Sequence, residues 1–325
     1  MSKRAPQTST AKPRKSTGPV ALRTKDFLTV TDLSRPELEA LLNLALELKA
    51  RPQPHAHALD GKSVVLLFEK PSLRTRVSFE VGVYRLGGHA LFYDHSAERI
   101  GSREALKDYA KNLERFAHCV VARVFEQSVL EGMAQHAQVP IVNALSNTHH
   151  PCQALADVLT LRQRFGKVAG LKLAYLGDGN NVCTSLAHAL CLLGGHITVI
   201  SPKGYVLPTD ILDTCKELAQ TSGGSLTTTS SLSAVDGADA IYTDAWVSMH
   251  HSDAEARYRA MRSYQVNPAL LARAAKHAIF MHCLPAERGD EVTDEVIDGP
   301  QSVVYDQAEN RLHAQNALLL SLLAP

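Results

Sequence analysis

Residues 171–200 read LKLAYLGDGNNVCTSLAHALCLLGGHITVI and set the pattern for most of the chain. Two short and continuously apolar runs, 171–177 and 196–200, have the length and composition of buried strands. The apolar segment between them, 181–193, has the length of a helix. A strand, a helix and a second strand in this order predict a parallel β-α-β unit, because parallel strands need a long crossover connection.

The same alternation extends along the chain in both directions. Strand-like runs fall into two series, separated by a long helical stretch at 151–165 that ends at Gly166. The runs lie at 63–68, 89–93, 118–125 and 140–145, and then at 171–177, 196–200, 240–244, 278–285 and 302–306. One helical segment begins near Ser72. Further helical segments lie at 104–116, 126–136, 181–193, 209–220 and 268–276. We therefore predict an α/β protein with two open parallel-sheet α/β domains joined by interdomain helices.

The two series also predict the domain boundaries. The first domain is expected at 26–155 and the second at 156–306, and a final helix at 307–323 is expected to pack back onto the first domain. Residues 1–25 carry seven Lys and Arg and no acidic residue, which predicts a disordered basic arm. The remaining 27 basic and 33 acidic residues make the body mildly acidic. Because nucleic-acid binding needs a basic surface, this acidic excess argues against nucleic acid as a partner.

Composition excludes several other classes of protein. The chain has 325 residues, 45% of them hydrophobic and 21% charged, as is typical of globular domains. No apolar stretch approaches the roughly 18 residues of a membrane span, so no membrane partner is expected. The six cysteines form no C-x-x-C pair and follow no secretory signal. We therefore expect neither a metal site nor a disulfide framework. We expect a cytoplasmic location.

The stretch EKPSLRTRVSFE, residues 69–80, follows the first strand and places Arg74 and Arg76 in the first turn of a helix that starts near Ser72. The first turn of a helix has unpaired N–H groups and the positive end of the helix dipole. Two cations there are unfavourable unless an anion is bound, which predicts a phosphate site. The alternative is that both arginines pair with neighbouring carboxylates.

Two further strands of the first series end in polar residues. Arg123 lies in an otherwise apolar run, and a buried arginine needs a partner, either a ligand or a structural ion pair. His150 and Gln153 follow the strand at 140–145, at the start of a helix that begins with a proline. His150 is therefore either a group that faces a ligand or a helix cap.

The second series offers fewer signals. Gly177-Asp178-Gly179 begins like a dinucleotide-binding loop, but Val182 stands where the third glycine is needed, so a nicotinamide cofactor is not expected. Asp244 and Ser248 lie in the loop after the strand at 240–244. Cys283 ends a later strand, where it could be a nucleophile, a substrate contact or inert packing.

Together these segments resemble the aspartate/ornithine carbamoyltransferase family, and its ornithine branch in particular. The similarity runs from about residue 26 to the end of the chain. The matching motifs are Ser72-Leu73-Arg74-Thr75-Arg76, His150-Pro151-Cys152-Gln153, the run from Asp244 to Met249, His282-Cys283-Leu284-Pro285 and Glu309-Asn310-Arg311.

The resemblance implies transfer of a carbamoyl group from carbamoyl phosphate to the δ-amine of ornithine, without a metal or organic cofactor. It implies that the first domain binds carbamoyl phosphate and that the second binds ornithine. The residues it implies for carbamoyl phosphate are Ser72, Leu73, Arg74, Thr75, Arg123, His150, Gln153, Cys283, Leu284 and Arg311. Those it implies for ornithine are Asn181, Asp244, Ser248 and Met249. The catalytic residues among them would be Arg123, His150, Asp244 and Cys283.

The resemblance also implies a homotrimer with shared active sites. Three positions depart from the family pattern: Leu73 replaces a threonine, His250 replaces a glycine, and Arg99 occupies the place where a neighbouring subunit often supplies a glutamine. His250 leaves N-acetylornithine or putrescine open as alternative acceptors. A non-catalytic partner protein that has kept the fold is the alternative of another class.

Overall fold

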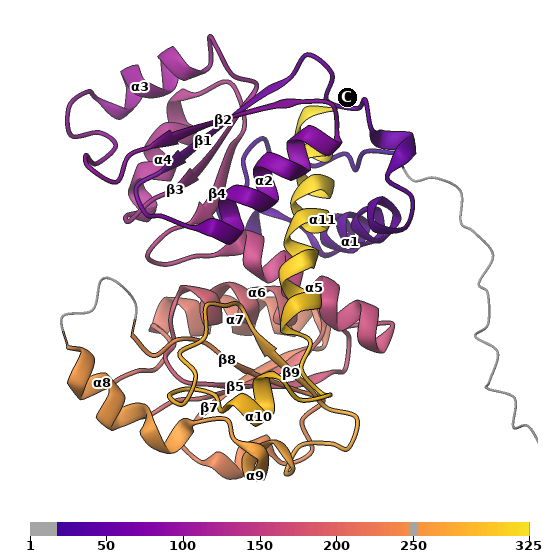
Figure 1. Cartoon of the computed structure of the whole chain (residues 1–325), viewed down its shortest axis with the longest axis vertical. Coiled ribbons are helices and arrows are strands. Elements are labelled where there is room, and N and C mark those ends of the chain that lie inside the picture. The colour runs from indigo at the N-terminus through magenta and orange to yellow at the C-terminus, as the bar shows by residue number, and fades with distance from the viewer. Residues whose placement is uncertain (1–17, 248–252, 325) are drawn as a thin grey trace, which may run out of the picture.

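The computed structural model describes residues 18–247 and 253–324, so the predicted ornithine residues Ser248 and Met249 lie outside the described part. Figure 1 shows two lobes, each built around its own sheet. The first half of the chain forms one lobe and the second half forms the other, while the last helix (yellow) runs from the second lobe back into the first. This arrangement confirms the predicted two-domain α/β fold.

The sheet of the first lobe contains four parallel strands in the order β2-β1-β3-β4. Its strands are β1 (Ser63–Phe68), β2 (His89–Asp94), β3 (Cys119–Arg123) and β4 (Ile141–Leu145). The helices of this half are α1 (Arg35–Ala50), α2 (Leu73–Arg85), α3 (Leu106–Leu113) and α4 (Gln127–His136). All four predicted strands are present. Strands β1, β3 and β4 are buried apolar runs that suit the interior of a parallel sheet, while β2 forms an edge and is largely exposed.

The sheet of the second lobe contains five parallel strands in the order β7-β6-β5-β8-β9. Its strands are β5 (Lys172–Leu176), β6 (His196–Ile200), β7 (Ser225–Thr229), β8 (Ala240–Thr243) and β9 (Ile279–His282). The helices of this half are α6 (Asn181–Leu193), α7 (Thr209–Ser222), α8 (Ala254–Met261), α9 (Pro268–Leu271) and α10 (Asp294–Ile297).

One predicted strand of this sheet is wrong and one observed strand was not predicted. The run at 302–306 makes only a single bridge, between Ser302 and Phe280, and the final helix begins at Val304. Strand β7 has the sequence SLTTT and is not an apolar run, because it lies at the edge of the sheet and is only partly buried.

Two long helices join the lobes. Helix α5 (Pro151–Phe165) ends, as predicted, at Gly166, whose φ of 77° favours glycine. Helix α11 (Val304–Leu323) packs against α5, α1 and α2. A Cβ atom at Gly82 on α2 would overlap the side chain of Asn316, so this glycine allows α2 and α11 to approach closely.

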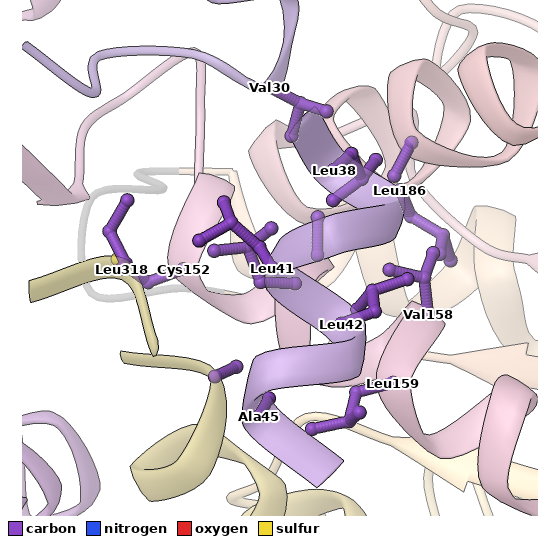
Figure 2. Close-up of a cluster of buried hydrophobic side chains, with 14 of the residues drawn as sticks. Val30, Leu38, Leu41, Leu42, Ala45, Cys152, Val158, Leu159, Leu186 and Leu318 are labelled. Carbon is purple, nitrogen blue, oxygen red and sulfur yellow. The ribbon is translucent and has the colours of Figure 1, made fainter. Parts of the chain in front are cut away.

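A cluster of apolar side chains fixes these helices to one another (Figure 2). Leu38, Leu41 and Leu42 of α1 are each at most 2% exposed. They lie among side chains of α5, α6 and α11 that include Val158, Leu186 and Leu318. Burial of each leucine contributes roughly 1.5–3 kcal/mol relative to exposure. The helices that carry active-site candidates therefore share one core.

The predicted disordered arm is too long at its C-terminal end. The backbone N–H of Val20 donates to Ser321 Oγ at 3.1 Å, and that of Arg23 donates to Glu37 Oε1 at 2.7 Å. Val20 and Arg23 therefore lie against α11 and α1, respectively. In the described part of the chain, no helix is both long and apolar enough to cross a membrane.

Candidate active site

The first turn of α2 forms one wall of the site. Ser72 is the N-cap residue: its Oγ accepts from the backbone N–H of Thr75 at 3.3 Å and donates to Thr75 Oγ1 at 3.0 Å. The Leu73 side chain is 76% exposed. Because this turn contains no acidic residue, its remaining N–H groups and the helix dipole stay available to an anion.

The two arginines of this turn have different surroundings. Arg76 Nε donates to Glu80 Oε1 at 3.0 Å, and its guanidinium stacks on the Phe92 ring. The ion-pair alternative is therefore correct for Arg76. Arg74 makes no ion pair with any carboxylate in the described part of the chain. Burial lowers the pKa of Arg74, while the nearby Cys283 and Asp244 of the second lobe act in the opposite direction.

Arg311 reaches this turn from helix α11. Its Nη1 donates to Gln153 Oε1 at 2.8 Å and its Nη2 donates to Thr75 Oγ1 at 3.1 Å. The Gln153 amide in turn donates to Asp157 Oδ1 at 2.8 Å, and burial raises the pKa of Asp157 to about 7. A buried guanidinium is thus held in place by side chains of α2 and α5.

Arg123 is the last residue of β3, and His150 follows β4 as the N-cap residue of α5. Arg123 Nε and His150 Nδ1 are both buried and make no hydrogen bond. Burial, reinforced by Arg311 and Arg74, lowers the pKa of Arg123 to about 9. The same causes hold the pKa of His150 well below its ordinary value, so its imidazole is neutral at neutral pH.

His150 occupies the N-cap position of α5, but its side chain makes no capping hydrogen bond, so the cap alternative is wrong. A buried donor without a partner costs about 1–3 kcal/mol. Two such groups, on Arg123 and His150, lie near Arg74 and Arg311 and form an arrangement that a bound anion with a polarised carbonyl would stabilise.

Asp244 faces this cationic cluster from the second lobe. Its Oδ1 accepts from Cys283 Sγ and from the Ala245 N–H, each at 2.9 Å, and its Oδ2 accepts from Asn180 Nδ2 at 2.8 Å. Asn180 was not predicted from the sequence. Its Oδ1 caps α6, and the G-N-N stretch was the available signal for this second role. The predicted neighbour, Asn181, donates to the carbonyl of Ser146 at 2.6 Å.

Cys283 is a thiol at neutral pH. Burial, together with the Asp244 carboxylate, raises the pKa of Cys283 well above its ordinary value. A neutral thiol that donates to a carboxylate is a poor nucleophile. The geometry therefore favours the substrate-contact alternative for Cys283 over covalent catalysis.

One group of metal-donor atoms occurs among the described residues. Asp244, His282 and Cys283 offer atoms that lie within 4.8 Å of one another. However, His282 Nε2 is 2.9 Å from Glu291 Oε1, and His282 Nδ1 accepts from the Leu284 N–H at 2.8 Å. Both ring nitrogens are thus occupied, and the group does not form a ready metal site.

Arg99 lies against its own chain. Its guanidinium stacks on the ring of Phe125 at 3.1 Å, and its Nη1 is 3.6 Å from Glu69 Oε2. Glu69 also accepts from the N–H groups of Ile100 and Phe125, so one buried carboxylate ties this loop to the end of β3.

Two family descriptions match the two lobes. "Aspartate/ornithine carbamoyltransferase, carbamoyl-P binding domain" matches residues 25–163, and "Aspartate/ornithine carbamoyltransferase, Asp/Orn binding domain" matches residues 169–322.

Similar proteins agree with this. The ornithine carbamoyltransferase of Shewanella oneidensis is 49% identical over 92% of this chain and 99% of that protein. The solved ornithine carbamoyltransferase of Pyrococcus furiosus is 42% identical with a TM-score of 0.90, over 94% of this chain and 99% of that one. A solved N-acetyl-L-ornithine transcarbamylase is 31% identical with a TM-score of 0.84, over 92% and 100%. The chain therefore belongs to the aspartate/ornithine carbamoyltransferase family.

Proposed function

We propose that this protein transfers the carbamoyl group of carbamoyl phosphate to the δ-amine of L-ornithine, giving L-citrulline and phosphate. The observation that carries this proposal is the grouping of Arg74, Arg123 and Arg311 around a neutral His150 whose Nδ1 makes no hydrogen bond, opposite Asp244. Three cations suit a phosphate dianion, and an opposing carboxylate suits an acceptor that carries ammonium groups. The relatives named ornithine carbamoyltransferase support the same reaction.

The first domain, at 26–155, would bind carbamoyl phosphate with help from the returning helix α11. The phosphate would contact the hydroxyls of Ser72 and Thr75, the backbone of Leu73, and the guanidiniums of Arg74 and Arg311. The carbonyl oxygen would accept hydrogen bonds from Arg123 and His150, whose free nitrogens support this role. The carbamoyl nitrogen would donate to Gln153 and to the carbonyl of Leu284.

The reaction needs stabilisation of the negative charge that develops on the carbonyl oxygen when the amine attacks. Arg123 and His150 would supply it as fixed donors in a buried site, an effect worth several kcal/mol. The carbon–oxygen bond to phosphate then breaks, and the cationic pocket stabilises the departing dianion. Contact between the two lobes would exclude water, which competes with the amine.

The second domain, at 156–306, would bind ornithine through Asn181, Asp244, Ser248 and Met249. The δ-amine, with a lysine-like pKa of about 10.4, must lose a proton before it attacks. Asp244 would hold the ammonium groups of the substrate, and the Cys283 thiol would orient that carboxylate. N-acetylornithine lacks the free α-amine, so the carboxylate of Asp244 favours ornithine over this acetylated acceptor. Putrescine differs from ornithine in that it lacks the α-carboxylate.

We further propose a cytoplasmic homotrimer with shared sites. Leu73, Val77 and Tyr84 of α2, with Leu91 and Tyr93 of the edge strand β2, are exposed apolar side chains on neighbouring elements. Burial of this surface against a second copy would bring the loop that contains Arg99 to a neighbouring site. Light scattering after gel filtration tests this, since a monomer at micromolar concentration would contradict it.

Measurement of carbamoylated product from carbamoyl phosphate with L-ornithine, N-acetylornithine and putrescine tests the reaction. We expect citrulline formation with ornithine to exceed turnover of the other two acceptors by about 10- to 150-fold, the range set by one lost charged contact of about 1.5–3 kcal/mol. Release of phosphate only with another amine would identify that amine, and not ornithine, as the acceptor. The absence of any product would favour a non-catalytic relative.

A further inference from the structure

The turn that follows β9 contains an unusual backbone conformation. Leu284 has a φ of 59°. In the described part of the chain it is the only residue other than glycine with a positive φ. A side chain with a Cβ atom is unfavourable in this left-handed region, so the surrounding structure must hold it there. Such conformations are concentrated at functional sites, and this one directly follows Cys283.

A buried pair of side chains holds the turn. The backbone N–H of Leu284 donates to His282 Nδ1 at 2.8 Å, so this nitrogen must carry a lone pair. The proton of the neutral ring is then on Nε2, which donates to Glu291 Oε1 at 2.9 Å. His282 and Glu291 are both completely buried.

Glu291 also connects the far side of the turn. Its Oε1 accepts from the backbone N–H of Glu287 at 2.7 Å, so one carboxylate oxygen joins the imidazole to the segment that follows the turn. On the other side, the backbone N–H of His282 donates to Gln307 Oε1 of helix α11 at 3.0 Å. The imidazole therefore cannot rotate without loss of both hydrogen bonds of its ring.

This arrangement leaves the Leu284 carbonyl without a donor. Among residues 18–247 and 253–324, no N–H or hydroxyl group donates to that oxygen. The left-handed conformation fixes the direction of the following peptide group, and with it the direction of this free acceptor. An acceptor of fixed direction discriminates between a ligand that presents an N–H group and one that presents a methyl group.

We propose that His282 and Glu291 form a positioning pair that makes the Leu284 carbonyl selective for the amino group of the carbamoyl moiety. The inference rests on the proposed function, which assigns that carbonyl to the carbamoyl nitrogen. Neither residue contacts the substrate. Both act by fixing the Leu284 backbone.

Two substitutions of His282 separate the two hydrogen bonds of the imidazole. In His282→Asn, the amide oxygen lies near the position of Nδ1 and can accept from the Leu284 N–H, but nothing reaches Glu291. In His282→Gln, the terminal amide lies near the position of Nε2 and can donate to Glu291, but the acceptor for Leu284 is lost.

The probes are phosphonoacetamide and (2-oxopropyl)phosphonate, which differ only by an amino group in place of a methyl group. Titration calorimetry with the wild-type protein should show a preference for the amide of about tenfold, as expected for one oriented hydrogen bond. His282→Gln should reduce this preference to about twofold or less, while its affinity for inorganic phosphate stays within about twofold of wild type. His282→Asn should retain an intermediate preference, because Leu284 keeps its acceptor while the contact with Glu291 is lost. A general loss of structure would instead weaken all three ligands together.

A preference that survives in His282→Gln, or that is lost equally in both variants, would overturn the positioning pair and leave the proposed reaction intact. A wild-type protein without any preference would overturn the pair together with the assignment of Leu284 to the carbamoyl nitrogen. Citrulline formation, measured separately, reports on the reaction itself.

If the His282 variants do not fold, the wild-type protein still provides a test. Nitrogen-15 NMR of the histidine side chains should show His282 protonated on Nε2 and unprotonated on Nδ1. A proton on Nδ1 would contradict the hydrogen bond from Leu284 and overturn the proposal. Glu291→Gln retains an acceptor for the imidazole and should keep the preference for the amide, whereas Glu291→Met should reduce it.

Discussion

Arg311 of the last helix donates from Nη1 to Gln153 Oε1 on α5 at 2.8 Å, across 158 residues of sequence. Because Gln153 in turn donates to the buried Asp157, the polarity of its amide is fixed, with the oxygen facing the arginine. The two helices that join the lobes are therefore also joined inside the site. The relative positions of Arg311 and Gln153 therefore depend on how those two helices pack.

Replacement of Arg311 by methionine should reduce kcat/KM for carbamoyl phosphate by about 100-fold or more. The reason is the loss of charge-assisted contacts, each worth about 1.5–3 kcal/mol. Steady-state kinetics at varied carbamoyl phosphate measures the change. Arg164→Met is the matched control, since Arg164 lies on α5 and pairs with the exposed Asp306. An Arg311 variant with the kinetics of the control would contradict the role.

Arg74 and Arg76 provide a test within a single helical turn. Arg74→Ala should weaken binding of carbamoyl phosphate by about 100-fold, because the guanidinium that faces the site is removed. Arg76→Ala should change binding by less than about twofold, because its partner is the surface residue Glu80 and such pairs contribute about 0–1 kcal/mol. Calorimetric titration with phosphonoacetamide measures both. Equal losses in the two variants would show that net charge alone matters.

Stability should fall on mild acidification because of two neighbouring histidines, the half-buried His149 and the buried His188. Burial lowers the pKa of each to about 4, below the 6.5 of an unfolded histidine. Between these values the unfolded chain binds more protons, so stability is present above pH 6.5 and is lost as the pH falls toward 4. The loss can reach about 3 kcal/mol per imidazole.

Thermal unfolding between pH 7 and pH 5 measures this dependence. His188→Met should reduce the fall in Tm, because one of the two imidazoles no longer takes up a proton on unfolding. His57→Met, at an exposed position, should leave the fall unchanged. An unaltered pH dependence in the His188 variant would contradict the account.

Cys283→Ser should retain a kcat within about tenfold of the wild-type value, because a hydroxyl can replace the thiol as a donor to Asp244 and that bond is worth about 1 kcal/mol. The effect should appear mainly in KM for ornithine. Steady-state kinetics at varied ornithine checks this. A loss of kcat by several orders of magnitude would instead indicate a covalent role for the sulfur.

The sequence predicted most of the sheets, because buried parallel strands such as β1 and β5 are continuous apolar runs. It did not predict β7, whose serine and threonine residues carry no apolar signal at a sheet edge. The run at 302–306 is apolar for a different reason. Val303 and Val304 are buried where the final helix starts.

The site was predicted less completely than the fold. The motifs indicated Arg74 and Arg123, but the different surroundings of Arg74 and Arg76 depend on Phe92 and Glu80, which only the folded chain brings next to Arg76. Asn180 was missed because it serves both as a helix cap and as a partner of Asp244, 64 residues away. Local pattern carries no information about such long-range pairs.

The most direct test of the account is a crystal structure with a bisubstrate analogue in which a phosphonoacetyl group is joined to the δ-nitrogen of L-ornithine. We expect the phosphonate at Ser72 and Arg74, the carbonyl oxygen within hydrogen-bond distance of Arg123 and His150, and the α-amine at Asp244. A carbonyl oxygen that contacts neither Arg123 nor His150, or an ornithine moiety bound away from Asp244, would contradict the proposed site.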